Sequence, residues 1–216
     1  MSSRSKKTFF GDFVFVVDEN VYEPAEDSFL FAENLNVKKC ERVLDMGTGC
    51  GILGVIAAKR ASDVVAVDVN PYAVRCAKKN TLINNVHNKV SFVQGDLFSP
   101  ISEKTMFDVI LFNAPYLPLE ESERSDSWIS RAWSAGTTGR EVIDRFINES
   151  VTYLKGRGRL LLLQSTITGF EETLLAFEKC GMSGKVIAEQ SLESLDNVRI
   201  ANIFGRTWDA MRLWFK

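Results

Sequence analysis

Residues 41–60, ERVLDMGTGCGILGVIAAKR, decide the fold of this chain. A short apolar strand ends at Asp45, and Gly47, Gly49 and Gly51 then lead into an apolar helical pattern. Glycines at such a turn let the backbone reverse tightly and let a ligand approach the main chain, as in nucleotide-binding strand-to-helix turns. The stretch therefore predicts the first unit of an open α/β sheet.

The acidic residue before the first glycine narrows the class of ligand. Asp45 stands where a carboxylate would repel a diphosphate, so the loop differs from the fingerprint of dinucleotide enzymes. A carboxylate suits a cationic ligand with an ammonium group, and S-adenosylmethionine carries both an ammonium and a sulfonium. We expect this nucleoside as the cofactor.

Strand and helix patterns alternate on both sides of this unit. We expect strands near 42–46, 63–67, 90–94, 107–112 and 158–164, and helices near 51–60, 71–84 and 139–155. This rhythm predicts a mostly parallel sheet with right-handed crossovers. A helix near 169–180 then leads to strands around 185–190 and 198–204, whose short polar connection predicts a closing antiparallel hairpin.

The whole of 1–216 is expected to form one domain, because its length suffices for a substantial core. Within it, 1–37 is an extension with a small hairpin turned at Gly11-Asp12 and a helix from about Glu26. Residues 38–205 form the cofactor-binding catalytic core, and 206–216 form a tail. The tail is expected to pack on the domain as a helix or extended segment, with membrane binding as the alternative.

Two further strand ends carry carboxylates. Asp68 lies about 20 residues past the glycine loop, where a carboxylate typically accepts from both ribose hydroxyls. Asp96 follows the next strand and could accept from an adenine amine. Each residue alone is better explained as a helix N-cap. Together with Asp45 and Asn113 at neighbouring strand ends, they favour a nucleoside pocket.

Residues 107–118, FDVILFNAPYLP, place Asn113-Ala114-Pro115-Tyr116 at the end of an apolar strand. A planar NH2 group is a poor nucleophile, and two acceptors on its hydrogens would orient it. The side-chain oxygen of Asn113 and the carbonyl of Ala114 offer such a pair. Pro115 aims that carbonyl, and Tyr116 can stack on a flat group. The alternative is an ordinary strand-end turn.

Composition excludes several other functions. Net charge is −2 with a pI near 5.6, and no basic stripe is evident, so nucleic acid is an unlikely ligand. The only histidine is His87, and the four cysteines lack metal spacing, which argues against a metal site. No apolar run reaches the length of a membrane span, and the start lacks a secretory signal. We expect a cytoplasmic protein.

Together these residues resemble the class I S-adenosylmethionine-dependent methyltransferases with the loop motif of amino-methyltransferases. Residues 21–28, VYEPAEDS, and 138–146, TGREVIDRF, resemble the HemK-like glutamine methyltransferases of the eukaryotic and archaeal type. The resemblance spans Val21 to Phe204. It implies a Rossmann-like fold with a seven-stranded, mostly parallel sheet, helices on both faces and a C-terminal antiparallel hairpin. The activity it implies is methylation of glutamine in the Gly-Gly-Gln loop of class I translation release factors.

The resemblance also implies roles for single residues. The cofactor-binding set is Ser28, Asp45, Gly47, Gly49, Asp68, Asp96 and Asn113, with Ser28 near the methionine end. The catalytic set is Asn113, Ala114, Pro115 and Tyr116. Ala114 departs from the family, which usually has proline there, and we expect a slightly looser loop.

Two kinds of partner are implied, the release factor as substrate and a small zinc-binding activator subunit. In this family the activator forms a heterodimer by adding a strand to one side of the sheet. Strand 90–94 is expected at the outer edge of the sheet, where its unpaired backbone groups would receive that strand.

Alternatives remain at this stage. The chain could methylate exocyclic amines of adenine or guanine in DNA or RNA, or it could be a binding subunit without catalysis. The long connection 117–139 is either a solvated loop, with its tryptophans against the core, or a substrate lid. Its acidic residues Glu120, Glu121, Glu123 and Asp126 would attract a basic protein surface.

Overall fold

The computed structural model describes residues 5–119, 127–192 and 195–205. The acidic residues Glu120, Glu121, Glu123 and Asp126 and the tail 206–216 lie outside the described residues. Among the described residues, no helix is long and apolar enough to span a membrane.

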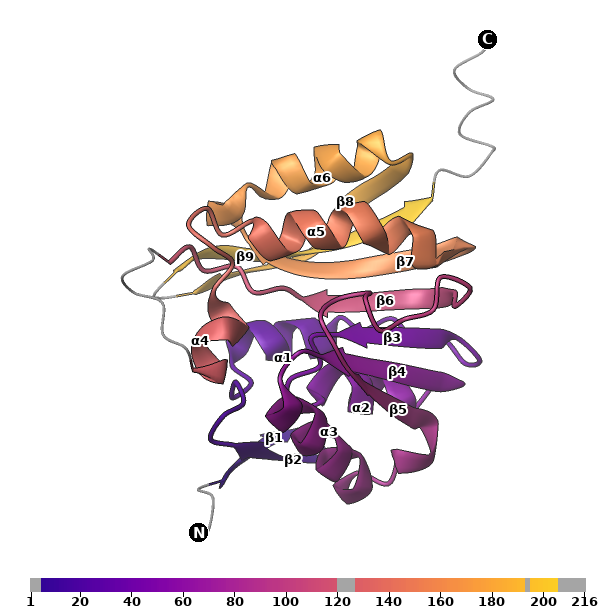
Figure 1. Ribbon diagram of the computed structural model, residues 1–216, viewed down its shortest axis with the longest axis vertical. Helices are drawn as coiled ribbons and strands as arrows, with labels where there is room; N and C mark the ends of the chain where they lie inside the picture. The colour runs from indigo at the N-terminus through magenta and orange to yellow at the C-terminus, as the bar shows by residue number, and fades with distance from the viewer. Residues whose placement is uncertain (1–4, 120–126, 193–194, 206–216) are drawn as a thin grey trace.

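The main sheet contains seven strands in the order β5-β4-β3-β6-β7-β9-β8 (Figure 1). Their bounds are β3 Arg42–Met46, β4 Asp63–Asp68, β5 Val90–Gln94, β6 Phe107–Asn113, β7 Leu154–Ser165, β8 Met182–Leu192 and β9 Leu195–Gly205. The pairs from β5 to β7 are parallel, whereas β9 runs antiparallel to both β7 and β8. The predicted fold class, including the closing hairpin, is confirmed.

Helices cover both faces of this sheet because side chains alternate along buried strands. In β3, Val43 packs into the core on one face and Leu44 into the core on the other. The first face carries α1 (Glu26–Glu33), α2 (Ile52–Ala58) and α3 (Pro71–Ile83), and the second carries α5 (Glu141–Ser150) and α6 (Phe170–Lys179). Each face thus has its own hydrophobic core.

The strand bounds differ from expectation mainly at β7, which begins at Leu154 rather than near residue 158. Gly156 and Gly158 resemble a turn in the sequence. They lie instead inside the strand, where the pairing with β6 shifts register between Phe107 and Val109. Gly158 is required there, because an added Cβ would lie 3.0 Å from the carbonyl oxygen of Phe107. The tertiary pairing therefore overrides the local turn signal.

Short helical elements escape the periodicity argument because they are less than two turns long. They are α4 (Trp128–Trp133) and the 3-10 turns η1 (His87–Lys89), η3 (Val151–Tyr153) and η4 (Thr166–Thr168). At the start of α4 the Ser127 side chain accepts a hydrogen bond from the Ser130 amide and so caps the helix.

The N-terminal hairpin, β1 (Ser5–Phe10) and β2 (Phe13–Asp18), turns where predicted and forms a separate two-stranded sheet. Helix α3 completes its outer edge with side-chain amides. Asn80 accepts from the Val16 amide at 2.8 Å and donates to the Val16 carbonyl at 3.0 Å, and Asn84 pairs with Val14 in the same way at 3.1 and 2.8 Å. The spacing of the two asparagines along the helix matches the spacing of the two valines along the strand. Four residues of a helix rise about 6 Å, and two residues of a strand rise about 6.6 Å.

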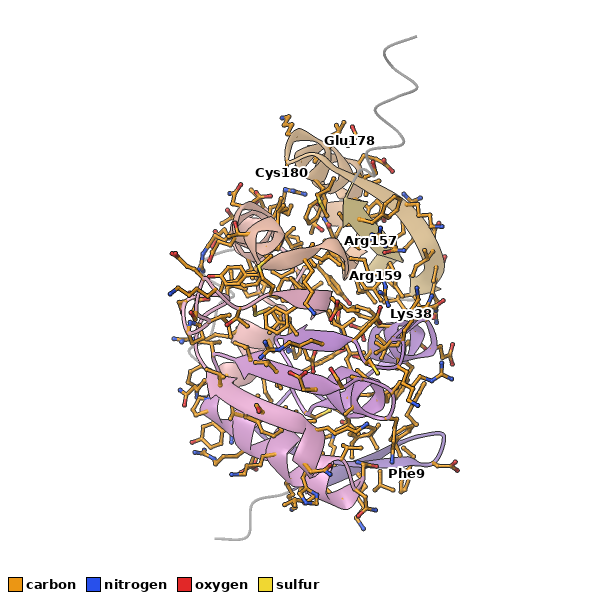
Figure 2. All side chains as sticks on the ribbon, turned by 90° about the vertical axis from the view of Figure 1, so that its right-hand side faces the viewer. Phe9, Lys38, Arg157, Arg159, Glu178 and Cys180 are labelled. Atoms are coloured by element: carbon orange, nitrogen blue, oxygen red, sulfur yellow. The ribbon has the colours of Figure 1, made fainter. Side chains whose placement is uncertain are left out.

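Figure 2 views the molecule from the side where the parallel strands begin. There Arg159, at the start of the regular part of β7, forms an ion pair with Glu41 at 2.7 Å, and both side chains are largely buried. Arg159 also donates to the Asn36 carbonyl. These contacts tie β7 to the loop that precedes β3.

Candidate active site

The carboxyl ends of four adjacent strands meet at one edge of the sheet. Met46 of β3 is paired with Val67 of β4 and with Phe112 of β6, while Asp68 is paired with Gln94 of β5. Because this register is regular, the side chains that follow each strand converge on one region. A cavity of about 420 Å³ opens there, and its walls include Ser28, Gly47, Gly49, Asp68, Asp96, Asn113, Ala114, Pro115 and Tyr116.

The glycine loop adopts the conformations that its residues allow. The φ values of Gly47, Gly49 and Gly51 are +64°, +57° and +89°. Residues other than glycine rarely adopt such values. At Gly51 an added Cβ would lie 3.0 Å from the Cβ of Ala77, so α2 and α3 could not pack as closely. The main chain of the loop consequently lies open to the cavity.

Asp68 lies at the end of β4 with both carboxylate oxygens held by the backbone. One accepts from the Gly49 amide at 2.8 Å and the other from the Asn70 amide at 2.9 Å. Burial raises the pKa of Asp68, and these amide bonds oppose the rise. The carboxylate is thus pre-oriented beside the glycine loop, and its contact with the hydroxyls of a ribose stays a prediction.

Asp45 does not belong to the cavity wall. It is buried under the loop, where one oxygen accepts from the Thr48 hydroxyl at 2.6 Å and from the Gly54 amide at 2.9 Å. Its Oδ1 is buried without a partner among the described residues. Burial raises the pKa of Asp45 to about 7. The geometry favours a role in holding the loop, and direct contact with a cofactor stays a prediction.

Asp96 lines the cavity, but its carboxylate also forms a 2.6 Å ion pair with Arg145 of α5. About half of each side chain is exposed in this pair. Contact of Asp96 with an adenine amine stays a prediction. The adjoining wall is apolar, with Leu97, Phe112 and Val142, which suits a flat base.

Asn113 divides its amide between two environments. Its Nδ2 donates to Asp27 Oδ2 and to Ser28 Oγ, both at 3.2 Å. Its Oδ1 is buried and has no hydrogen-bond donor among the described residues. A buried acceptor without a donor is costly, so this oxygen is a candidate acceptor for an N–H group of a ligand.

Asp27 is a residue of the cavity wall that sequence reasoning did not single out. It is 4% exposed, and it accepts hydrogen bonds from Tyr22, Ser28, Asn113 and Tyr116. An acidic residue in the first turn of α1 is already explained by the favourable interaction of negative charge with a helix N-terminus. The one signal was its place inside the VYEPAEDS segment, which carried the resemblance.

The catalytic loop is fixed from several sides. The Ala114 amide donates to the Leu163 carbonyl at 3.4 Å, a bond that proline could not make, and Ala114 is buried. The looser loop expected from this residue therefore finds no support in the contacts. Tyr116 is also buried, and both burial and Asp27 raise the pKa of its phenol. Gly139 lies against the Tyr116 carbonyl, where a Cβ would approach to 3.0 Å.

Helix α4 supplies a further wall through Trp128, Arg131 and Trp133. Trp133 is 41% exposed and meets the ring of Tyr22 edge-on, with 6.4 Å between centroids. Backbone bonds between Leu117 and both Trp133 and Ala135 fasten this segment beside the catalytic loop. The described part of 117–139 thus borders the cavity, as the lid interpretation requires, and whether it closes over a substrate stays a prediction.

The fold, the glycine loop and the strand-end carboxylates define a Rossmann-like methyltransferase of class I. The chain belongs to the methyltransferase small domain family, whose model matches residues 17–129.

Among its relatives is the Methanocaldococcus jannaschii protein named for protein N5-glutamine methyltransferase activity. It is 46% identical over 169 residues, which cover 78% of this chain and 84% of the relative. The human methyltransferase HEMK2 is 31% identical over 176 residues, covering 76% of this chain and 81% of the relative.

A solved structure, the E. cuniculi Mtq2–Trm112 complex responsible for methylation of the eRF1 translation termination factor, is also similar. It has a TM-score of 0.63 and 28% identity, and the match covers 87% of this chain and 99% of that chain. The M. jannaschii tRNA m1G37 methyltransferase has a TM-score of 0.70 at 17% identity, with 96% of this chain and 56% of that chain covered. That second likeness shows the fold alone.

Proposed function

We propose that this enzyme transfers a methyl group from S-adenosylmethionine to the side-chain amide nitrogen of glutamine in the Gly-Gly-Gln motif of a class I translation release factor. The observation that carries the proposal is the buried, unpartnered Oδ1 of Asn113 beside the Ala114-Pro115-Tyr116 loop. Relatives named for glutamine methylation, including one 46% identical, support the same acceptor. Release factors act in the cytoplasm, where we place the enzyme.

The residues present fit S-adenosylmethionine. Glycines with positive φ leave backbone open at the cavity, Asp68 is oriented by two amides, and an apolar wall suits a base. Ser28 lines the cavity, its hydroxyl accepts from Asn113 Nδ2 at 3.2 Å, and we assign it to the methionine end of the cofactor. When bound, the cofactor supplies a methyl group on a positively charged sulfur.

The chain's own residues orient the acceptor. Asn113 Oδ1 and the Ala114 carbonyl would accept the two N–H groups of the glutamine amide, so that the nitrogen lone pair faces the methyl group. Tyr116 and the neighbouring aromatic rings would hold the flat amide and exclude water. Positioning of this kind can lower a barrier by about 7 to 11 kcal/mol, so no strong base is needed.

The decisive experiment offers labelled S-adenosylmethionine with three acceptors: a release factor, the same factor with its Gly-Gly-Gln glutamine replaced, and duplex DNA. Label on the first alone is the expected result. Label on DNA would instead support an exocyclic-amine methyltransferase, and label on both release factors would move the acceptor away from this glutamine.

The cofactor assignment has its own test. Asp68→Ala should weaken S-adenosylmethionine by about 1 to 3 kcal/mol, because a pre-oriented charge-assisted acceptor is lost. Calorimetric titration measures this directly, with Asp63→Asn, which removes a carboxylate at the opposite end of the same strand, as the matched control. Wild-type affinity in Asp68→Ala would remove Asp68 from the site.

We also propose a small activator subunit that pairs with β5. The E. cuniculi neighbour was solved as a complex of two proteins, and β5 is the outermost strand on its side of the sheet. Zinc binding by that subunit is part of the proposal and rests on the family resemblance.

A further inference from the structure

We propose that Asp27 is a positioning residue for methyl transfer, which fixes the orientation of the Asn113 amide and strengthens its oxygen as the acceptor for the substrate N–H. The inference deepens the proposed function and rests on it. Asp27 and Asn113 are 86 residues apart in the sequence, so the contact exists only because α1 packs beside the end of β6.

The two carboxylate oxygens of Asp27 accept hydrogen bonds from different donors. Oδ1 accepts from the Ser28 amide at 2.6 Å and from the Tyr22 hydroxyl at 3.1 Å, which fixes the carboxylate on its own side of the site. Oδ2 accepts from Asn113 Nδ2 at 3.2 Å and from the Tyr116 hydroxyl at 3.3 Å. One carboxylate therefore holds two residues of the catalytic loop at once.

Asp27 sets the direction of the Asn113 amide. An amide can turn over and exchange its oxygen and nitrogen, and its environment decides which orientation is stable. An ionised carboxylate can only accept hydrogen bonds. Nδ2 must therefore face Asp27, and Oδ1 must take the other position, where it is buried without a donor. A neutral amide at position 27 would remove this bias, because it could donate as well as accept.

The charge of Asp27 also acts on the Asn113 amide. The donors to Asp27 among the described residues are all neutral groups, and the side chain is 4% exposed. Its charge is therefore weakly screened and polarises the Asn113 amide toward Oδ1. As the acceptor nitrogen gains the methyl group it becomes more positive, and its N–H groups become stronger donors. The benefit is largest in the transition state, so it should appear in kcat.

A merely structural role would give a different result. Asp27 also anchors the first turn of α1 through Ser28, so its loss could lower stability and, with it, every activity. Positioning predicts a loss that is confined to kcat and that depends on the presence of Asn113. The two roles are thus separable by a double-mutant cycle.

The test begins with Asp27→Asn, which keeps the shape and removes the charge. We expect kcat on the release factor to fall about 10- to 100-fold, with KM and cofactor affinity within about twofold, as for weakening one charge-assisted hydrogen bond. In the Asn113→Ala background the same substitution should change kcat less than threefold. Asp63→Asn, which removes a half-exposed carboxylate of β4 that is ion-paired with Arg42, is the charge-matched control.

A second readout needs neither substrate nor cofactor. Asn113 Nδ2 donates to Asp27 and Ser28, so Asp27→Asn should shift the resonances of the Asn113 side-chain amide in an NMR spectrum. If Asp27→Asn does not fold, Ser28→Ala removes the other acceptor of Asn113 Nδ2, and its coupling to Asn113→Ala tests the same network.

The positioning role would be overturned if the kcat losses of Asp27→Asn and Asn113→Ala multiplied in the double variant. It would also be overturned if Asp27→Asn lowered cofactor affinity and kcat equally. Unchanged resonances of the Asn113 side-chain amide in folded Asp27→Asn would overturn the geometry. These outcomes are distinct from failure of the proposed function, which would appear as absence of label on the release factor with the wild-type enzyme.

Discussion

Asn113 Oδ1 is a buried acceptor that the described residues leave without a donor, although such an atom costs about 1 to 3 kcal/mol. In the proposed reaction the substrate would supply the missing N–H. At the scale of single residues, the site is thus organised around an incomplete hydrogen bond.

Asn113→Ala removes one of the two acceptors that orient the glutamine nitrogen. We expect turnover to fall at least about 100-fold, equivalent to about 2.7 kcal/mol of transition-state stabilisation, while cofactor affinity changes much less. Steady-state kinetics and calorimetry measure the two effects. Asn148→Ala, an exposed asparagine on α5, is the matched control. Equal losses in cofactor binding and turnover would make Asn113 a cofactor ligand instead.

Asp45 should make the stability of the ligand-free protein depend on pH. Burial raises its pKa to about 7, whereas an unfolded chain would show about 3.9. Between these values the folded state binds a proton that the unfolded state lacks, so the free energy of unfolding should decrease as pH rises from about 4 to about 7.

Asp45→Asn should flatten this dependence in part, because Asp68 shares the upward shift of pKa. Thermal unfolding at a series of pH values, beside Asp63→Asn, measures the slope. A slope unchanged by Asp45→Asn would mean that Asp45 does not carry the proton.

The sequence predicted Asn113, Tyr116, Asp68 and the glycine loop, because each lies next to a strand end that periodicity alone can place. It did not predict Asp27. The donors that define Asp27 come partly from residues 86 and 89 positions away, and no local pattern encodes that proximity. Similarly, the sequence shows that Asp45 is a carboxylate close to the glycine loop. It does not show that Asp45 lies beneath the loop, because that position depends on tertiary packing.

At the scale of elements, α3 connects the hairpin to the cofactor region. Asn80 is fully buried and donates to the Cys50 carbonyl at 2.8 Å as well as to Val16. One side chain therefore joins β2, α3 and the glycine loop. The sequence predicted the hairpin and the helix separately, but their pairing through side-chain amides depends on an orientation that neither element specifies alone.

Asn80→Ala should lower the free energy of unfolding by about 3 kcal/mol, since the Val16 amide and the Cys50 carbonyl lose their partner, while the Val16 carbonyl keeps the Cys76 thiol. Cofactor affinity should fall as well. Asn84→Ala frees only Val14 and the Asn80 carbonyl, so it should loosen the hairpin with cofactor binding retained. Denaturant titration and limited proteolysis of the hairpin measure both. Identical behaviour of the two variants would contradict the link to the glycine loop.

At the scale of the whole molecule, the two edges of the main sheet differ. β5 is short and parallel to its neighbour, whereas β8 is long and antiparallel, with register shifts between Val186 and Ala188 and between Gln190 and Leu192. Irregular pairing of this kind protects an edge from further strand addition. The difference favours β5 as the edge that an activator would extend, as its sequence position predicted.

Co-expression with an activator subunit should raise solubility and activity, and Phe92→Lys on β5 should abolish that gain. Phe92 is half-buried at this edge, and a charge there would be desolvated by a docked strand. Val186→Lys on β8, where the side chain is 41% exposed, is the matched control and should leave the gain intact. A monomer with full activity and no response to the activator would refute the dependence.

The amide pairing of β2 with α3 has a consequence for the order of synthesis. The hairpin leaves the ribosome before α3, because its partner Asn80 lies 64 residues after Val16, and Asn113 likewise lies 86 residues after Asp27. The early segment must therefore wait, with Phe13 and Phe15 exposed to solvent, until α3 has been made. A nascent chain arrested before residue 80 should be a substrate for chaperones, and release from them should coincide with the first protection of the hairpin from proteases.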